Sequence, residues 1–174
     1  MSEDRLIVEE RDEFGVIRVV EQGDFRYLEF GDEVEQSCVL TADPSWLEYD
    51  YSRAMLLGAL CHSKPKRALF LGFGAGSLTL ACLRHLALDE VEAIELRPAV
   101  PRLAREHLGL GEDPRLLLRV GDAVQELQDC EPADLIFLDL YTDTGPAPAH
   151  LGWDFLGACR ERLRPGGWLV INQW

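Results

Sequence analysis

Lys66 to Leu83 reads KRALFLGFGAGSLTLACL, an apolar strand that runs into a glycine-rich turn and then into a helix. Glycine lets the backbone turn tightly and approach a ligand, and the helix N-terminus offers unpaired N–H groups and a partial positive charge. Gly72, Gly74 and Gly76 are therefore predicted to bind a nucleotide-like ligand. Their G-x-G-x-G spacing, in place of G-x-G-x-x-G, favours an adenosyl sulfonium cofactor over a dinucleotide.

The chain changes its apolar periodicity near Thr41 to Pro44. Before that boundary, short β-type runs alternate with turn residues, which predicts a small antiparallel sheet element over residues 1–43. We expect most of this element to serve dimerisation or to act as a lid, and not to take part directly in chemistry. The runs are Leu6 to Glu9, Val16 to Val20, Phe25 to Phe30, and Val34 to Val39.

Residues 44–174 show short apolar runs that alternate with amphipathic helices, for example the face formed by Val100, Leu103, Ala104 and Leu108. Such runs are typical of a parallel sheet covered on both faces, and right-handed crossovers then give an α/β, doubly wound, Rossmann-like domain. The runs are Ala68 to Leu71, Val91 to Leu96, Leu116 to Val120, Leu135 to Leu138, and Trp168 to Ile171.

Composition limits the classes of partner. With 174 residues, of which 47% are hydrophobic, the chain is expected to be a globular protein of one main domain. Its acidic start lacks the basic, then apolar, then small-residue order of a secretory signal peptide, so a cytoplasmic protein is expected. A net charge of -14 argues against nucleic acid or membrane as partner and permits a cationic substrate. The 5 cysteines are scattered singly, so no metal site is expected.

Two carboxylates are predicted to contact the nucleoside. Glu95 closes the second parallel run, where a carboxylate accepts hydrogen bonds from both ribose hydroxyls. A solvated charge at a strand end is the alternative. Asp122 follows the third run and is suited both to capping the next helix and to facing the adenine amino group.

Two further carboxylates are predicted to serve the reaction. Asp139 ends the fourth run at the carboxyl edge of the sheet, and Asp143 follows in a Gly- and Pro-rich loop. Carboxylates at a cleft mouth can bind an amine and accept its proton, which leaves a nitrogen able to attack an electrophilic carbon. For a loop Asp, a solvated turn is the alternative.

In this order the motifs resemble the spermidine synthase family, also called polyamine aminopropyltransferases, from about Val8 to the end of the chain. FGDEVEQSCV is similar to the family's strand that carries a cofactor-contacting Gln, and this Gln maps onto Gln36. WLEYDYSRAML is similar to the family's helix that carries a substrate-side Tyr, and this Tyr maps onto Tyr51. LFLGFGAGS, AIELRP, VGDA and LDLYTD follow in the family's order.

The resemblance implies a class I methyltransferase-like fold and a transferase of polyamine biosynthesis, without a metal. Such an enzyme moves an aminopropyl group from decarboxylated S-adenosylmethionine to a small amine, and a homodimer is expected. Asp139 would be the base, with Asp143 and Tyr51 as helpers. Phe70, two places before Gly72, is apolar as in the synthases, whereas common methyltransferases carry an acid there.

Three departures from the family pattern fall where the amine would bind. Ala75 replaces an Asp of the glycine turn, Ser52-Arg53 replaces His-Glu, and Asp143 is displaced by one residue. They leave open an S-adenosylmethionine-dependent small-molecule methyltransferase, with Arg53 as partner of the donor carboxylate, and a non-catalytic module that retained the fold. Because the chain ends at Trp174, just after the fifth run, we expect another subunit or a C-terminal segment to cover that sheet edge.

Overall fold

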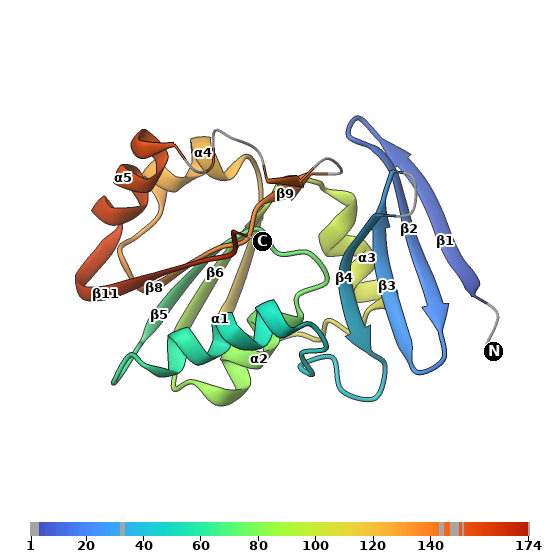
Figure 1. Ribbon diagram of the computed structural model, residues 1–174, viewed down its shortest axis with the longest axis horizontal. Coiled ribbons are helices and arrows are strands. Elements are labelled where there is room, and N and C mark those ends of the chain that lie inside the picture. The colour runs from blue at the N-terminus through green and yellow to red at the C-terminus, as the bar shows by residue number, and fades with distance from the viewer. Residues whose placement is uncertain (1–3, 32–33, 143–144, 147–149, 151, 174) are drawn as a thin grey trace.

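The computed structural model describes residues 4–31, 34–142, 145–146, 150 and 152–173. A four-stranded antiparallel sheet precedes a five-stranded parallel sheet, and both were predicted (Figure 1). The antiparallel strands are β1 (Arg5–Asp12), β2 (Gly15–Gln22), β3 (Phe25–Phe30) and β4 (Val34–Leu40). The parallel strands are β5 (Arg67–Leu71), β6 (Glu90–Glu95), β7 (Leu116–Val120), β8 (Ala133–Leu138) and β11 (Leu163–Ile171).

The parallel sheet has the order β11-β8-β5-β6-β7, so the chain crosses over once beside β5 and the sheet is doubly wound. Residues of α1, α2 and α3 pack on one face, and residues of α4, η1 and α5 on the other. A two-stranded ribbon of β9 and β10 follows β8. The remaining elements are α1 (Asp50–Leu60), α2 (Ser77–His85), α3 (Ala99–His107), α4 (Ala123–Glu126), η1 (Leu127–Asp129), β9 (Tyr141–Thr142), β10 (Gly145–Pro146) and α5 (Trp153–Glu161).

Residues of the central strand β5 are buried along its whole length. Phe70 of β5 and Phe137 of β8 are register partners whose rings stack at a centroid distance of 4.3 Å. Each buried aromatic side chain removes a large apolar area from water, and such pairs add about 0.5–1.5 kcal/mol beyond that area. The apolar runs therefore fix the middle of the sheet, and the polar residues that follow each run lie at its carboxyl edge.

β11 begins earlier than the predicted run. It starts at Leu163, and its pairing with β8 is interrupted until Trp168, because the Pro165-Gly166-Gly167 segment breaks the register. The strand lies at the edge of the sheet, and within the described residues only β8 pairs with it. Helix α1 packs on the same strand, where Gly58 approaches Val170.

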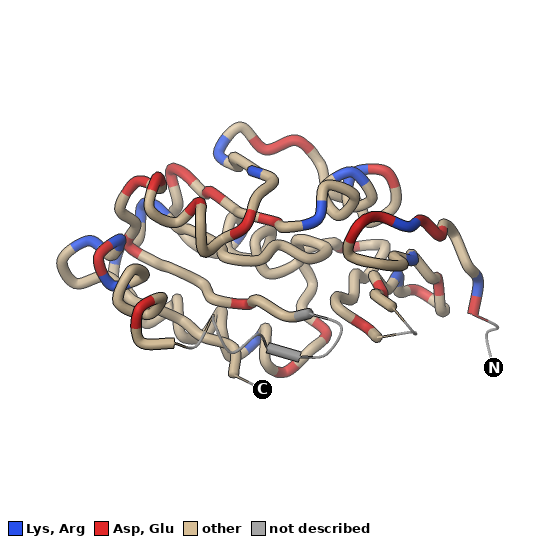
Figure 2. The backbone as a smooth tube through the Cα atoms, turned by 90° about the horizontal axis from the view of Figure 1, so that it is seen from above, with Lys and Arg blue, Asp and Glu red and all other residues tan. Residues whose placement is uncertain are grey.

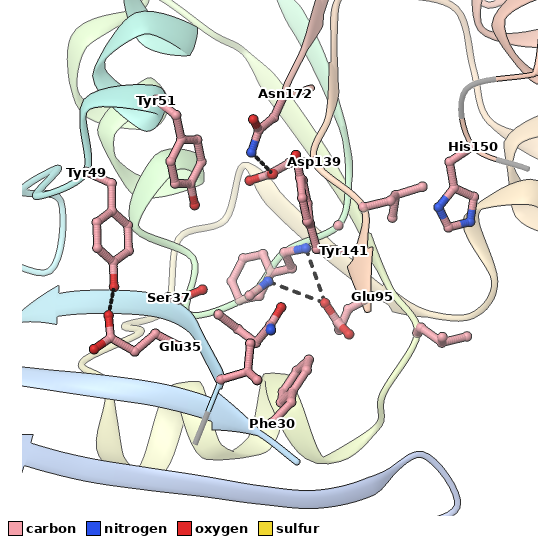
Figure 3. Close-up of a pocket in the computed structure, with 17 residues that line it drawn as sticks. Phe30, Glu35, Ser37, Tyr49, Tyr51, Glu95, Asp139, Tyr141, His150 and Asn172 are labelled. Carbon is pink, nitrogen blue, oxygen red and sulfur yellow. Dashed lines mark hydrogen bonds between the residues drawn. The ribbon is translucent and has the colours of Figure 1, made fainter. Parts of the chain in front are cut away.

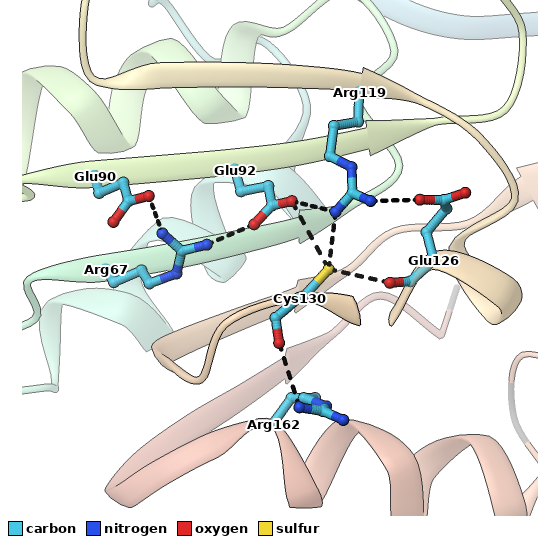
Figure 4. Close-up of polar contacts among 7 residues, drawn as sticks. All are labelled: Arg67, Glu90, Glu92, Arg119, Glu126, Cys130 and Arg162. Atoms are coloured by element: carbon cyan, nitrogen blue, oxygen red, sulfur yellow. Dashed lines mark hydrogen bonds and ion pairs between the residues drawn. The ribbon is translucent and has the colours of Figure 1, made fainter. Parts of the chain in front are cut away.

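A network of ion pairs lies on the face of the parallel sheet that α4 and η1 cover (Figure 4). Glu92 of β6 is only 4% exposed at its side chain, and it accepts hydrogen bonds from Arg67 of β5 at 2.5 Å and Arg119 of β7 at 2.7 Å. Arg119 also bonds Glu126 of α4 at 2.6 Å. The two guanidinium groups offset the cost of burying the Glu92 charge, which explains how this carboxylate fits in the middle of a buried strand.

Arg97 joins the antiparallel sheet to the larger domain. Its guanidinium donates to both carboxylate oxygens of Asp12 at 2.8 and 3.0 Å and to the Gly15 carbonyl at 3.0 Å. It also lies 4.2 Å from the centre of the Phe30 ring, a cation–π contact. The side chain is 5% exposed, so these contacts form in a protected environment and hold β1, β2 and β3 against the loop after β6.

The 31 acidic residues outnumber the 17 Lys and Arg residues. In Figure 2 acidic positions are spread over both the antiparallel sheet and the larger domain. Among the described residues, no helix is long and apolar enough to cross a membrane.

Candidate functional site

A cavity of about 420 Å³ lies where the carboxyl ends of the parallel strands face β4 and the start of α1 (Figure 3). The glycine turn forms its floor, the strand ends after β6 and β8 form one wall, and β4 forms another. This is the place where doubly wound sheets bind ligands, and the volume suits a small molecule. Of the predicted residues, those that line the cavity are Gln36, Tyr51, Gly72, Gly74, Glu95 and Asp139.

Close approach explains the glycines of the turn. Gly72 has a φ of 94°, and a Cβ there would lie 2.1 Å from the Asp139 carbonyl oxygen. A Cβ on Gly74 would lie 2.3 Å from Ser37 Oγ on β4. Both positions therefore accept only glycine, and the turn is pressed between the end of β8 and β4.

The antiparallel sheet contacts the turn through two hydroxyl groups. The Ala75 N–H donates to Ser37 Oγ at 3.1 Å, and Ser77 Oγ donates to the Cys38 carbonyl at 3.1 Å. The sheet predicted to serve dimerisation or to act as a lid thus forms part of the cavity wall. Gln36 immediately precedes Ser37 on β4 and lines the cavity, and its contact with the cofactor stays a prediction.

Glu95 closes β6 and is buried beside the turn. Its carboxylate accepts hydrogen bonds from Phe73 N at 3.2 Å, Gly74 N at 3.3 Å and Arg97 N at 3.0 Å. Burial raises the pKa of Glu95, and these N–H groups oppose the rise. A carboxylate offers about four lone-pair positions, and the two bonds from the turn are long for N–H···O bonds. Glu95 therefore retains acceptor capacity toward the cavity that it lines.

Asp139 follows β8 and is held by one amide. Asn172, just after β11, donates from Nδ2 to Asp139 Oδ1 at 2.9 Å. Burial raises the pKa of Asp139, and the Asn172 bond acts in the opposite direction. Tyr51 lines the same part of the cavity, and burial together with the nearby Asp139 charge raises the pKa of Tyr51, so its hydroxyl stays protonated. The pair thus offers a proton acceptor beside a proton donor.

Three predicted residues lie elsewhere. Gly76 is the N-cap of α2 and lines a smaller cavity of about 40 Å³, which shares Tyr51, Phe73 and Asp139 with the main one. Asp122 caps α4 by accepting from Val124 N at 2.9 Å and is not among the residues that line the main cavity. Its contact with adenine stays a prediction. Asp143 lies outside the described residues.

Arg53 points away from the main cavity. Its guanidinium donates to the Leu47 carbonyl at 2.6 Å and to Asp50 at 3.1 Å, and it lies over the Trp46 ring. It lines a separate surface hollow between α1 and α2. A guanidinium so placed does not face a donor bound in the main cavity.

Sequence reasoning missed several residues that line the cavity, namely Glu35, Ser37, Tyr49, Tyr141, His150 and Asn172. Asn172 follows a parallel strand at the carboxyl edge, so the rule that found Glu95 and Asp139 applies to it as well. Tyr49 precedes the predicted Tyr51 by two residues. Nothing in the sequence marks Glu35, because an alternating strand turns it and Gln36 to opposite faces.

Within the described part of the chain, no group of three or more His, Cys, Asp or Glu side chains is arranged to hold a metal ion. The His62, His85 and His107 side chains do not line the main cavity, and His150 does.

Comparison with known proteins decides the family. The spermine/spermidine synthase domain matches residues 49–173. The chain belongs to the spermine/spermidine synthase family. This confirms the resemblance given by the order of the motifs, and it places the matched region over α1 and the parallel sheet.

Curated members of the family match much of the chain. A polyamine aminopropyltransferase of Nitrosomonas europaea is 36% identical over 142 residues, which cover 78% of this chain and 43% of that protein. One of Chromobacterium violaceum is 30% identical over 162 residues, which cover 91% of this chain and 61% of that protein. The chain spans about half the length of the curated relatives it matches.

Solved structures confirm the fold. A spermidine synthase in complex with the transition-state analogue AdoDATO superposes with a TM-score of 0.73 at 19% identity, covering 92% of this chain and 53% of that one. The spermidine synthase of Thermotoga maritima gives 0.74 at 20%, covering 92% and 54%. Human methyltransferase-like protein 13, in complex with SAH, gives 0.64 at 22%, covering 70% and 63%. The family fold is thus the class I methyltransferase-like one.

The packing of the turn predicts a large difference between two glycine substitutions. Gly72→Ala places a Cβ against the Asp139 carbonyl oxygen at a positive φ, whereas Gly15 has a φ of 108° with no atom within 4 Å of an added Cβ. Gly15→Ala should lower the free energy of unfolding by about 1–2 kcal/mol through backbone strain alone. Gly72→Ala should lose a further ~1–3 kcal/mol through the clash. Urea unfolding followed by circular dichroism measures both, and equal losses would contradict the close approach.

Proposed function

We propose that this chain transfers an aminopropyl group from decarboxylated S-adenosylmethionine to an amine. The observation that carries the proposal is the charge of the cavity. Glu35, Glu95 and Asp139 line it, and none of its described lining residues is Lys or Arg. A sulfonium donor and an amine acceptor are both cations, so both are attracted to this site. The family relationship supports the same reaction.

The nucleoside end of the donor is proposed to lie along the glycine turn. Glu95 has acceptor capacity toward the cavity for ribose hydroxyls, and Gln36 supplies an amide from β4. Charge-assisted hydrogen bonds of this kind each contribute about 1.5–3 kcal/mol. The adenine is then expected on the side of Leu96 and Leu140, two apolar residues of the same wall.

The reaction proposed is a direct displacement. The acceptor nitrogen forms a bond to the sulfur-bound methylene carbon of the donor's aminopropyl group, the bond between that carbon and sulfur breaks, and its electron pair stays on sulfur as a neutral thioether. The acceptor nitrogen gives up a proton to the Asp139 carboxylate. The sulfonium is already activated, so the protein mainly positions two reactants and removes a proton. Asn172 holds the carboxylate, and Tyr51 and Asp143 are proposed as helpers.

The choice of donor separates this proposal from methyl transfer. S-adenosylmethionine carries a carboxylate that would face three carboxylates of the cavity, and Arg53 is directed elsewhere. Decarboxylated S-adenosylmethionine should therefore bind at least ~10-fold more tightly, a difference of about 1.4 kcal/mol, by isothermal titration calorimetry. Asp139→Asn should abolish turnover of an amine acceptor and leave donor affinity within about twofold. Tighter binding of S-adenosylmethionine would favour a methyltransferase, and donor binding without turnover of any amine would favour a non-catalytic module.

The role of Asp139 as base predicts a pH dependence. Burial raises the pKa of Asp139, and activity that needs its charged form is lost as the pH falls through that raised value. Asn172→Ala removes the hydrogen bond that favours the charged form, so the acid limb of the kcat/KM profile should move to higher pH. Gln173→Ala, at the exposed neighbouring position, should leave the limb in place. An acid limb that is the same in both variants would remove Asp139 from the role.

We also propose that the chain forms a homodimer, with a small amine as its other partner, in the cytoplasm. The outer edge of β11 and the adjoining surface of α1 support a subunit contact there. Trp168 on β11 is 44% exposed, and Leu57 on α1 is 63% exposed. An unpaired strand edge beside exposed apolar side chains favours association.

Sedimentation velocity tests the dimer. The unaltered chain should sediment as a dimer, and Leu57→Glu should shift it to a monomer because a charge is placed in the contact. Leu117→Glu is the control, because Leu117 is similarly exposed, at 52%, on β7 at the opposite edge of the sheet. A monodisperse monomer of the unaltered chain would count against the proposal.

A further inference from the structure

Arg97 contacts two residues of the cavity wall from outside the cavity. Its backbone N–H donates to Glu95, and its guanidinium lies over the Phe30 ring, 4.2 Å from the ring centre. Glu95 and Phe30 both line the main cavity, whereas Arg97 does not. In Figure 3, Glu95 and Phe30 lie on the lower side of the cavity, away from Tyr51. Arg97 therefore supports the end of the cavity that is proposed to hold the nucleoside.

The Glu95 carboxylate is held at both of its oxygens. Arg97 N donates to Oε1 at 3.0 Å, and the two longer bonds from the glycine turn reach Oε2. The Arg97 backbone is itself fixed, because its carbonyl accepts from Val100 N at 3.0 Å in the first turn of α3. A carboxylate bound at each oxygen is restrained in its orientation. The bond from Arg97 thus helps to decide which lone pairs of Glu95 remain for a ligand.

The Arg97 guanidinium makes in-plane and stacking contacts at once. Two of its nitrogens donate to the two carboxylate oxygens of Asp12, and one of them also donates to the Gly15 carbonyl. The Cζ atom lies over the Phe30 ring. This combination needs the planar fork of arginine, because a lysine ammonium is a point charge that cannot form two parallel bonds and stack. Asp12 thereby fixes the guanidinium, and the guanidinium restrains the ring.

A second ion pair joins the same two parts of the chain without reaching the cavity. Arg102 of α3 bonds Glu10 of β1, the strand that also carries Asp12. Arg102 also bonds Glu106, one turn further along α3. The Arg102 side chain is 45% exposed, and neither Arg102 nor Glu10 lines the main cavity. Of the two pairs, that of Arg97 is the one that contacts residues of the cavity wall.

We propose that Arg97 is a positioning residue for the nucleoside end of the donor, and that Asp12 acts through it. The Arg97 N–H orients the Glu95 carboxylate, and the guanidinium holds the Phe30 ring as a fixed apolar surface of the cavity. This inference rests on the proposed function, because that proposal places a nucleoside beside Glu95. It adds that donor affinity depends on Asp12, a residue of β1 that lies outside the cavity.

Calorimetric titration of methylthioadenosine, the thioether product of the proposed transfer, tests the inference. Arg97→Lys keeps the positive charge and the backbone N–H, and it should weaken binding by roughly 10-fold because the Phe30 ring loses its support. Asp12→Asn should weaken binding by roughly 3-fold, because the guanidinium keeps its other contacts. In the Arg97→Lys protein, Asp12→Asn should add no more than about twofold, since the connection is already broken.

A kinetic measurement separates positioning from a general structural role. The assay uses decarboxylated S-adenosylmethionine as donor and 1,4-diaminobutane as amine. Arg97→Lys and Asp12→Asn should each raise the KM for the donor and leave the KM for the amine within about twofold, because the Arg97 contacts lie at the nucleoside end. A parallel rise in both KM values would contradict the role of Arg97.

Glu10→Gln is the matched control, because it breaks the ion pair of Arg102 on the same strand. It should leave the methylthioadenosine affinity and both KM values within about twofold. Equal weakening of binding by Glu10→Gln and Asp12→Asn would overturn the inference, since any loosening of β1 would then be sufficient. If circular dichroism shows that Arg97→Lys does not fold, the comparison of Asp12→Asn with Glu10→Gln decides the question alone.

Failure of the proposed function is distinguishable from failure of this inference. An unaltered chain that binds no methylthioadenosine would refute the proposed function, and this inference with it. Binding that is equally tight in the unaltered chain, Arg97→Lys and Asp12→Asn would refute the inference and leave the proposed function standing.

Discussion

The contact between Gly72 and the Asp139 backbone is the constraint on which the site depends. An added Cβ would lie 2.1 Å from the Asp139 carbonyl oxygen, so only glycine lets the end of β5 lie this close to the end of β8. Gly72 N in turn bonds the Ile94 carbonyl of β6 at 3.0 Å. Three strand ends are thereby drawn together, and the acids that follow β6 and β8 face one cavity. Ser37 presses on the same turn from β4 and closes it from the other side.

The protein treats its buried acids in two ways. Glu92, away from the cavity, is paired with Arg67 and Arg119, so its charge is balanced within the framework. Glu95 and Asp139 accept hydrogen bonds from neutral donors, and burial raises the pKa of both. Among the described residues neither carboxylate forms an ion pair with a guanidinium, although the Arg97 charge also acts to lower the pKa of Glu95. A buried acid without a counter-charge costs folding free energy, and a cationic ligand relieves that cost.

Sequence predicted the elements whose signal is local and repeated. The apolar runs located the four antiparallel and five parallel strands, because strand length and side-chain period depend on near neighbours. The order of motifs also gave the family. The predicted run for β11 was too short, because the Pro165-Gly166-Gly167 segment has no apolar strand pattern and separates Leu163 from the apolar run that begins at Trp168. Glu35 was missed because β4 carries one extra residue, Gln36, opposite β3, so side chains there do not alternate regularly, and such a bulge depends on the pairing of two strands.

Arg97 connects Glu95, which lines the cavity, to the antiparallel sheet. Its backbone N–H holds Glu95 at 3.0 Å, and its guanidinium grips Asp12 and the Gly15 carbonyl of the antiparallel sheet. Arg97 thus contacts both Glu95 and the antiparallel sheet that borders the cavity. If Glu95 binds a nucleoside as proposed, nucleoside binding and the packing of that sheet would be linked equilibria. By thermodynamic reciprocity, whatever free energy a bound nucleoside gives to docking, docking returns to nucleoside affinity.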